Sequence, residues 1–354
     1  MQHSFAEKLY EWHETIERGL PWKETRDPYL IWVSEIILQQ TRVEQGMPYY
    51  HRFIERFPNV SALANADEDD LLAVWKGLGY YSRARNMHKA ARVIKKELGS
   101  FPSSYDSILA LPGVGPYTAA AISSFAFDEP YPVIDGNVKR VITRYFGIQE
   151  PIDTSSGEKL VKQKLELVFD RKDPSKFNQA IMDFGALKCK PKNPICQDCP
   201  MVKECKAYID EMTDRIPFKV KKLKKSKRFF HYFIVTIGDR VVLRKRTAKD
   251  IWRGLYEPLL MEERSGAVME KSRQEELLNG WILFKGLRNG GETINKKQLL
   301  SHQEIHATFY PYHFEEGSVE VKVPVELVNL KNLSNFAVPK VVDWYLTDFS
   351  IPLE

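Results

Sequence analysis

The sequence has 354 residues, of which 43% are hydrophobic and 28% are charged, with a net charge of +5. A chain of this length and composition is expected to form two or more globular domains, each with its own core. The absence of a signal-peptide core or an apolar membrane span argues against a membrane protein and predicts a cytoplasmic location. The excess positive charge allows a polyanionic partner if the basic residues are clustered.

Helical patterns account for most of the first two hundred residues. The first helix is expected over residues 4–18, ended by Gly19 and Pro21, and the second begins at Asp27-Pro28 and runs to about residue 45. The second is apolar around most of its circumference, so it is expected to be buried. Further helices are expected over residues 48–57, 61–75, 82–98, 138–146, 157–169 and 174–187.

Glu35 lies inside the apolar second helix, with Gln39 and Gln40 one turn further along. A buried carboxylate is costly unless it is partnered or protonated, and burial raises its pKa. Glu35 is therefore a candidate proton donor. The alternative is a side chain that turns outward and is solvated.

The loop GLGYYSRAR, residues 77–85, has two adjacent tyrosines followed by two arginines. Aromatic side chains can stack on or wedge between bases while arginines bind phosphates. The alternative is a tyrosine pair packed in the core beside solvated arginines.

Residues 111–140, LPGVGPYTAAAISSFAFDEPYPVIDGNVKR, form the stretch around which the chain is organised. Gly113 and Gly115 permit a tight hairpin, and Pro116 suits the first turn of the helix that follows. The free N–H groups of such a helix N-terminus can bind a phosphate. Asp135 begins the next helix, where it is either a site residue or an ordinary N-cap.

The four cysteines, Cys189, Cys196, Cys199 and Cys205, all fall within seventeen residues in a C-x6-C-x2-C-x5-C spacing. Such a cluster predicts a metal site rather than disulfides in a reducing compartment. Four thiolates can bind zinc or a four-iron cluster. A single Cys-x-x-Cys pair flanked by two lone cysteines favours iron–sulfur.

A change in periodicity marks a second domain. Seven of the ten residues over 219–228 are basic, which indicates a linker that either tracks a phosphate backbone or is a solvated hinge. Residues 229–246 read as a β-hairpin that turns at Gly238-Asp239. Further strands are expected over 281–284, 307–314 and 319–328, with a helix over 339–346, so residues 229–354 are predicted to be α+β.

These motifs resemble those of a known family. LPGVGPYTA followed by VIDGNV resembles the helix-hairpin-helix and catalytic aspartate of the endonuclease III superfamily of DNA glycosylases, and the cysteine spacing resembles that superfamily's cluster loop. Within it, WVSEIILQQTRVEQ, GLGYYSRARN and FNQAIMDFGA resemble the MutY family of adenine DNA glycosylases. This resemblance covers residues 5–210. Further on, TIGDRVVLRKR and IWRGLYEPLL resemble the Nudix-like domain with which that family recognises 8-oxoguanine.

The resemblance implies a multi-domain fold. Residues 1–212 form an all-α helix-hairpin-helix glycosylase region, with a six-helix barrel over about 21–130 and a cluster domain made of the N-terminal helix and about 131–212. Residues 213–228 are a basic linker, and residues 229–354 an α+β Nudix-like recognition domain. No glutamate-rich metal-binding helix is evident there, so recognition without Nudix hydrolysis is expected. The implied cofactor is a [4Fe–4S] cluster bound by the four cysteines.

The implied activity is base-excision repair. A monomeric, bacterial, cytoplasmic enzyme would flip adenine out of double-stranded DNA, where it is mispaired with 8-oxoguanine or guanine, and hydrolyse its N-glycosidic bond. Glu35 would protonate adenine at N7, and Asp135 would stabilise the oxocarbenium-like sugar. Tyr117 stands where bifunctional relatives carry a Schiff-base lysine, which a tyrosine cannot replace, so efficient AP lyase activity is not expected.

The resemblance also implies roles for further residues. Adenine would be bound by Trp22, Leu38 and Gln179, with Tyr117 supporting the site, Asn137 positioning catalytic groups, and Gln39 and Lys23 nearby. Lys23 replaces an arginine more usual in the family. Gln40 and Tyr80 would wedge into the base stack. In LLSHQ, Ser301 and His302 would contact 8-oxoguanine, with Leu300 in place of a phenylalanine, or would merely turn a loop. Gly113, Gly115, Lys188 and Lys190 would contact phosphates.

Two other functions compete with this interpretation. One is a glycosylase with lyase activity on oxidised pyrimidines, against which Tyr117 and the C-terminal domain argue. The other is a non-catalytic DNA-binding protein, which would have no use for the pair of Glu35 and Asp135.

Overall fold

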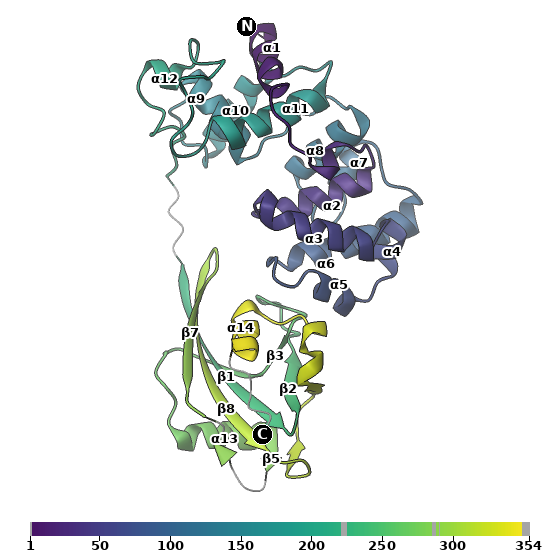
Figure 1. Ribbon diagram of the computed structural model, residues 1–354, viewed down its shortest axis with the longest axis vertical. Coiled ribbons are helices and arrows are strands. Elements are labelled where there is room, and N and C mark those ends of the chain that lie inside the picture. The colour runs from purple at the N-terminus through teal and green to yellow at the C-terminus, as the bar shows by residue number, and fades with distance from the viewer. Residues whose placement is uncertain (1, 221–224, 285–287, 290, 349–354) are drawn as a thin grey trace. The chain divides into compact units, whose positions relative to one another are not determined.

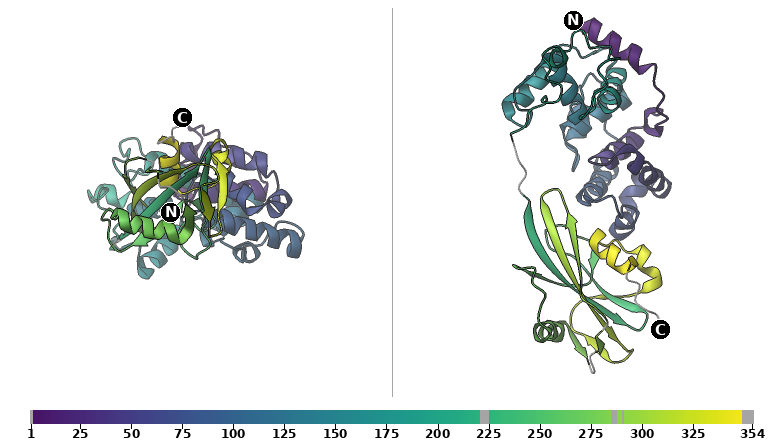
Figure 2. Two further views of the ribbon diagram at one scale, coloured as in Figure 1. Left: turned by 90° about the horizontal axis from the view of Figure 1, so that it is seen from below. Right: turned by 60° about the vertical axis from the view of Figure 1, so that its left-hand side comes forward.

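The computed structural model describes residues 2–220, 225–284, 288–289 and 291–348. The chain separates into two compact units, the first formed by residues 1–65 and 85–222 and the second by residues 66–84 and 223–354. Figures 1 and 2 show that the first unit is helical and that the second contains the sheet. None of the described helices is long and apolar enough to cross a membrane.

The helical part of the chain carries its elements in the order α1 (Gln2–His13), η1 (Pro21–Lys23), α2 (Pro28–Leu38), α3 (Val43–Arg56), α4 (Val60–Asn65), α5 (Glu68–Val74), α6 (Ser82–Val93), η2 (Ile94–Leu98), α7 (Tyr105–Leu109), α8 (Pro116–Phe127), α9 (Gly136–Phe146), α10 (Ser155–Glu166), α11 (Pro174–Asp183), η3 (Phe184–Lys188) and α12 (Lys206–Ile209). Buried apolar residues of α1, α8, α9, α10 and α11 form one core, which joins the N-terminal helix to the helices after the hairpin.

The second helix is shorter than predicted, because α2 ends at Leu38 and α3 begins at Val43. Gln40 between them has φ 58°, in the left-handed region, which interrupts the helix. The first helix also ends early, at His13 rather than residue 18, and the stretch 61–75 forms two short helices, α4 and α5. Helix periodicity alone does not reveal these interruptions, because the apolar positions continue through them.

The second unit contains strands β1 (Ser226–Ile237), β2 (Arg240–Lys245), β3 (Tyr256–Glu257), β4 (Leu259–Glu263), β5 (Ile282–Phe284), β6 (Arg288–Asn289), β7 (Ile294–Leu299), β8 (Gln303–Phe314), β9 (Val319–Val321) and β10 (Glu326–Asn329), with helices α13 (Lys271–Trp281), η4 (Leu330–Asn335) and α14 (Lys340–Asp348). The long strands β1 and β8 are parallel neighbours, paired from Ser226↔Gln303 to Ile237↔Phe314. The sheet order is β10-β2-β1-β8-β6, with β4 beside β1 and β7 beside β8.

The sheet is covered on both faces, by α13 on one side and α14 on the other (Figures 1 and 2). Alternate residues of β1 divide between the two cores: Phe230, Tyr232 and Ile234 pack with α14, whereas Phe233 and Val235 pack with α13. This alternation is the period of two expected of a strand buried on both faces.

The predicted hairpin turn is confirmed by the pair Ile237↔Arg240. The strand that leads into it begins at Ser226, so the last residues of the expected linker belong to the sheet, whereas residues 221–224 lie outside the described part of the chain. The predicted strand over 319–328 is two strands, β9 and β10.

Helix α13 was not predicted. It carries Glu275 and Glu276, and Arg273 donates to Glu276 at 2.7 Å.

Candidate active site

A cavity of about 370 Å³ lies in the first unit, between η1, α2, α8, α9 and α11. It brings together ten of the residues singled out from the sequence, which are Trp22, Lys23, Glu35, Leu38, Gln39, Gln40, Tyr117, Asp135, Asn137 and Gln179. These residues are spread over more than 150 positions in the chain. Their convergence on one cavity is a property of the fold that spacing in the sequence does not reveal.

Glu35 is buried on α2 and accepts a hydrogen bond from the Tyr117 hydroxyl of α8, with 2.8 Å between Oη and Oε2. The pKa of Glu35 is raised to about 7, chiefly by burial and also by the nearby Asp135 carboxyl, while the Tyr117 hydrogen bond and the Lys23 charge oppose the rise. The outward-facing alternative is wrong. At neutral pH a substantial fraction of Glu35 is protonated, which is the state a proton donor requires.

Asp135 caps α9 and also faces the cavity. One carboxylate oxygen accepts from the Val138 backbone N–H at 2.7 Å, as an N-cap does, and the other accepts from Asn137 Nδ2 at 2.8 Å. Burial raises the pKa of Asp135 above its ordinary value, although these hydrogen bonds and the Arg140 charge act in the opposite direction. The two sequence interpretations of Asp135, as N-cap and as site residue, are therefore compatible.

Arg140 connects this aspartate to the cysteine loop, and the sequence analysis missed it. Its Nη2 donates to Asn137 Oδ1 at 2.8 Å, and its Nε donates to the Cys189 carbonyl at 2.7 Å. The signal was present in the spacing, since Arg140 lies one helical turn after Asn137 and therefore on the same face of α9.

Asp183 is a second residue that the sequence analysis missed. This buried carboxylate of α11 accepts from His13 Nε2 at 3.0 Å, from Arg18 Nη1 at 2.8 Å and from Lys23 Nζ. Burial by itself would raise the pKa of Asp183, but hydrogen bonds from His13 and Lys23 and the positive charge of Lys23 lower it to about 2. Asp183 lies one turn after Gln179, so the two share the cavity face of α11. It fixes Lys23 at the cavity wall.

The remaining wall is partly aromatic and partly amide. The indole of Trp22 is buried and makes an edge-to-face contact with Tyr50, with 5.1 Å between ring centroids. Gln39 Nε2 donates to Thr118 Oγ1 at 3.2 Å, and Gln179 Nε2 lies 3.4 Å from Ser175 Oγ. A flat aromatic surface with nearby amide and carboxyl groups suits a planar heterocycle with polar edges.

The cysteine loop follows η3 directly, and Cys189, Cys196, Cys199 and Cys205 line one cavity. Burial raises the pKa of Cys199 to about 12, while a backbone N–H of Met201 donates to its sulfur and lowers that pKa. Two backbone N–H groups, of Tyr208 and Ala207, do the same for Cys205. Across the described ranges, no three or more potential ligand side chains converge on one point, as the ligands of a single ion would. A set of four sulfurs with N–H donors fits an iron–sulfur cluster.

Of the two glycines in the hairpin between α7 and α8, only Gly113 adopts a backbone conformation that favours glycine. Gly113 has φ +77°, and a Cβ there would lie 2.5 Å from Asn86 Cβ, whereas a Cβ at Gly115 would meet nothing within 4 Å. Lys188 ends η3, and the Lys190 carbonyl accepts from Arg144 Nη1 at 2.7 Å. The hairpin and the lysine-bearing loop are thus both fixed by contacts within the first unit.

Tyr80, Ser301 and His302 belong to the second compact unit. Tyr80 has φ 48° and is 42% exposed, whereas Tyr81 is buried, so the tyrosine pair divides between surface and core. Within that unit the Tyr80 hydroxyl is hydrogen-bonded to Ser301 Oγ. His302 is exposed, whereas Leu300 is half-buried and packs against the core under α14.

Comparisons with known proteins show which families the chain resembles. Residues 33–169 match the family model described as HhH-GPD superfamily base excision DNA repair protein, and residues 231–348 match a NUDIX domain. An adenine DNA glycosylase of Buchnera aphidicola from Baizongia pistaciae is 40% identical over 311 residues, 86% of this chain and 84% of the relative. Another from Schizaphis graminum is 39% identical over 258 residues, 71% and 73% of the two chains. The solved structure of a thermostable thymine-DNA glycosylase covers 59% of this chain and 97% of its own, with a TM-score of 0.55 and 31% identity.

Proposed function

The chain belongs to the adenine DNA glycosylase family, and from this premise we propose that it removes adenine mispaired with 8-oxoguanine or guanine by hydrolysis, without efficient lyase activity. It would act as a monomer on duplex DNA in the bacterial cytoplasm. The observation that carries the proposal is the pair of buried carboxyl groups, Glu35 and Asp135, in one cavity of suitable size for a flipped base.

The two carboxyl groups suit opposite tasks. Glu35, with its pKa raised to about 7, would donate a proton to adenine N7 and so improve the leaving group. Asp135, held by the backbone N–H of Val138 and the amide of Asn137, would remain ionised and stabilise the positive charge that develops on the sugar. Trp22 and Leu38 would enclose the ring, and Gln179 would hydrogen-bond its edge.

Hydrolysis rather than lyase chemistry is supported by Tyr117. A lyase needs an amine that forms an imine with the sugar, and the side chain that faces Glu35 from α8 is a phenol. The amine of Lys23 also lines this cavity, but it forms an ion pair with Asp183. The alternative function, a non-catalytic DNA-binding protein, does not explain why the pKa of the buried Glu35 is raised to about 7.

Specificity would come from the base opposite adenine, because adenine itself is a normal base. 8-Oxoguanine differs from guanine by an N7–H donor and an O8 acceptor. The hydroxyl of Ser301 can accept from the first and donate to the second. Tyr80, its hydrogen-bond partner in the second unit, offers an exposed ring that could stack at the lesion.

The cofactor proposed for the cysteine loop is a [4Fe–4S] cluster bound by Cys189, Cys196, Cys199 and Cys205. Four cysteine sulfurs line one cavity, and their spacing, with a single Cys-x-x-Cys pair between two lone cysteines, favours a cluster over a zinc ion. The cluster would supply four metal–sulfur cross-links to a loop with little regular structure. The loop would in turn present Lys188 and Lys190 to phosphates, with the hairpin at Gly113 and Gly115 as a second phosphate contact.

The central experiment measures base removal from duplexes with adenine opposite 8-oxoguanine, under single turnover, with and without alkali. Glu35→Gln and Asp135→Asn should each abolish base removal yet retain duplex binding, because an amide neither donates the proton nor stabilises the cation. Glu150→Gln, at an exposed glutamate of the same unit, is the control. Near-normal rates in either active-site variant would refute the assignment, and a stoichiometric borohydride-trapped adduct would refute the monofunctional mechanism.

The metal is tested separately on anaerobically purified protein. We expect about four irons per chain and a brown colour with broad visible absorbance. Cys199→Ala should lose the iron. Cys199 does not line the cavity that contains Glu35. Stoichiometric zinc without iron would overturn the cluster and leave the glycosylase assignment standing.

A further inference from the structure

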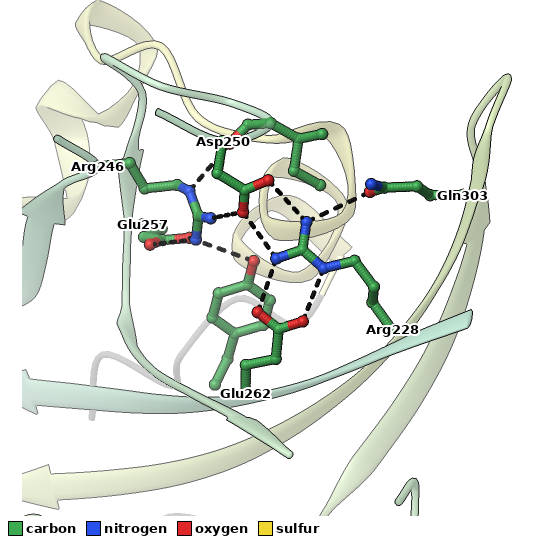
Figure 3. A network of polar contacts seen from close by, with 8 residues as sticks. Arg228, Arg246, Asp250, Glu257, Glu262 and Gln303 are labelled. Atoms are coloured by element: carbon green, nitrogen blue, oxygen red, sulfur yellow. Dashed lines mark hydrogen bonds and ion pairs between the residues drawn. The ribbon is translucent and has the colours of Figure 1, made fainter. Parts of the chain in front are cut away.

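An ionic network in the second unit, buried at Glu257 and partly exposed at Glu262, ends at Gln303 (Figure 3). The guanidinium of Arg228 donates to both oxygens of Asp250, at 2.9 and 2.7 Å, and to both oxygens of Glu262, each at 2.7 Å. One of its donors, Nη1, also lies 3.4 Å from Gln303 Oε1. The sequence analysis placed Arg228 in the basic linker, but in the structure its guanidinium binds two carboxylates of the protein itself.

The network continues away from the loop through Arg246. This second guanidinium donates to Asp250 at 2.8 Å and to both oxygens of Glu257, at 2.8 and 3.0 Å. Glu257 is fully buried, and Tyr232 donates to it at 3.4 Å. The two guanidinium groups also lie over the ring of Phe230, at 4.8 and 5.7 Å from its centroid.

Stability is a weak explanation for such a network. Arg246 and Glu257 are removed from water and Arg228 largely so, although Asp250 and Glu262 stay partly exposed, and well-packed apolar side chains of similar volume often stabilise a core as well. The network instead fixes the relative orientation of the segments that it joins. Planar guanidinium groups with paired contacts hold β1, β4 and the loop after β2 in one fixed geometry.

The loop of Ser301 is tied to that geometry at three points. The Leu300 N–H donates to the Gln303 carbonyl at 2.8 Å and closes the turn, and the Ser226 N–H donates to the His302 carbonyl at 3.1 Å. The third tie is the Gln303 side chain on Arg228. Ser301 thus lies in a turn that ends at Gln303, whose side chain contacts Arg228. The same turn is bound to the backbone of Ser226, two residues before Arg228 on β1.

We propose that Arg228, acting through Gln303, is a positioning residue for the 8-oxoguanine-reading loop. This inference rests on the proposed recognition of 8-oxoguanine by Ser301. A hydroxyl that must both accept from N7–H and donate to O8 needs a fixed position, because hydrogen bonds weaken steeply with distance and angle. Arg228 touches neither the base nor the reacting bond, and its effect reaches the DNA only through the loop.

The test uses the full chain and the ratio of single-turnover rates on duplexes with adenine opposite 8-oxoguanine and opposite guanine. Gln303→Met removes the acceptor for Arg228 and leaves the four guanidinium–carboxylate contacts in place, and should lower the ratio by about two- to fivefold, the effect of one hydrogen bond. Gln303→Glu keeps an acceptor and should retain the ratio. Arg228→Lys keeps the charge but loses the paired contacts, and should lower the ratio at least as much as Gln303→Met.

The double variant Gln303→Met, Ser301→Ala separates positioning from general structure. If Gln303 acts through Ser301, its substitution has no further effect once the hydroxyl is gone. Tyr312→Phe is the stability control, because it removes a buried hydrogen bond to Gln274 of 2.6 Å in the same domain, far along β8 from the loop. Tyr312→Phe should lose about as much thermal stability as Gln303→Met but leave the ratio of rates unchanged.

The outcomes distinguish the inference from the function beneath it. A lowered ratio in Ser301→Ala with an unchanged ratio in Gln303→Met and Arg228→Lys would overturn the positioning role and leave the recognition proposal intact. Additive losses in the double variant would overturn it as well. An unchanged ratio in Ser301→Ala would remove the recognition proposal and the positioning role together.

Discussion

Single carboxyl groups in this protein take their properties from what surrounds them. Glu35 and Asp183 both lie at the same cavity and are both buried, yet the pKa of Glu35 is raised to about 7, chiefly by burial, while hydrogen bonds from His13, Lys23 and Arg18 and the charge of Lys23 lower the pKa of Asp183 to about 2. One is suited to give up a proton near neutral pH and the other is a permanent anion. The difference is the charge of the neighbours and not the side chain itself.

The pKa of Glu35 predicts a pH dependence. A general acid acts only when protonated, so the single-turnover rate should fall as the pH rises through about 7. Tyr117→Phe removes a hydrogen bond that favours the carboxylate, so the pKa of Glu35 should rise and the fall should move to higher pH. Rates measured between pH 5.5 and 9 with saturating enzyme test both expectations.

The matched control is Tyr105→Phe, at a tyrosine of the same unit that stacks on Tyr131, with 4.2 Å between centroids, and does not line the cavity. Its profile should coincide with that of the unchanged chain. A rate independent of pH across this range in the unchanged chain would contradict the role of Glu35 as the proton donor.

At the scale of elements, two helix N-termini organise the first unit. Helix α8 begins behind the glycine hairpin, and α9 begins at the Asp135 cap. The N–H groups at the start of α8 are the proposed phosphate contact, whereas a backbone N–H at the start of α9 donates to the Asp135 carboxylate. Arg140 of α9 contacts both Asn137 and the cysteine loop, so that three hydrogen bonds in series connect Asp135 to Cys189.

The hairpin yields a prediction that separates its two glycines. Gly113→Ala should destabilise the chain by about 1–2 kcal/mol or more, because φ +77° is strained for alanine and the new methyl group would lie 2.5 Å from Asn86 Cβ. Gly115→Ala should cost less, since φ −100° is ordinary and nothing lies within 4 Å.

The measurement is the free energy of unfolding of both variants, followed by their affinity for duplex DNA at several salt concentrations. Weaker phosphate contact should flatten the salt dependence for Gly113→Ala. Equal stability of the two variants would show that the hairpin accommodates a side chain at Gly113.

At the scale of the whole molecule, the residues proposed for base removal and those proposed for reading the opposite base lie in different compact units. Every residue that lines the cavity belongs to the first unit, whereas Ser301, His302 and the Arg228 network belong to the second. A chain that removes a normal base gains from such a division, because chemistry and choice of the opposite base can then be set by separate sets of contacts.

Deletion of residues 229–354 tests this division. Base removal should persist, since the deletion leaves the cavity residues in place, but the ratio of rates opposite 8-oxoguanine and guanine should fall by at least the several-fold expected for loss of one hydrogen bond. Retained iron content reports that the remaining chain is folded. An unchanged ratio would show that the C-terminal domain serves another purpose.

The sequence by itself determined the features that depend on local pattern: the glycine hairpin, the Asp135 cap, the cysteine spacing, the Gly238-Asp239 turn and the change from helix to strand. It suggested Glu35 as a buried acid because a charge in an apolar helix is conspicuous. It did not reveal the break at Gln40, because one left-handed residue leaves the apolar pattern undisturbed. Nor did it reveal α13, whose mostly polar surface gives a weak helical signal.

Only the tertiary structure decided how side chains far apart in the chain meet. Tyr117 reaches Glu35 across 82 positions, Asp183 accepts from three side chains of the N-terminal segment, and Arg228 pairs with Asp250 and Glu262. A pKa, an ion pair or a cavity depends on neighbours in space, and local spacing carries no information about them. The residue types were legible in the sequence, but their protonation and partners follow from the packing.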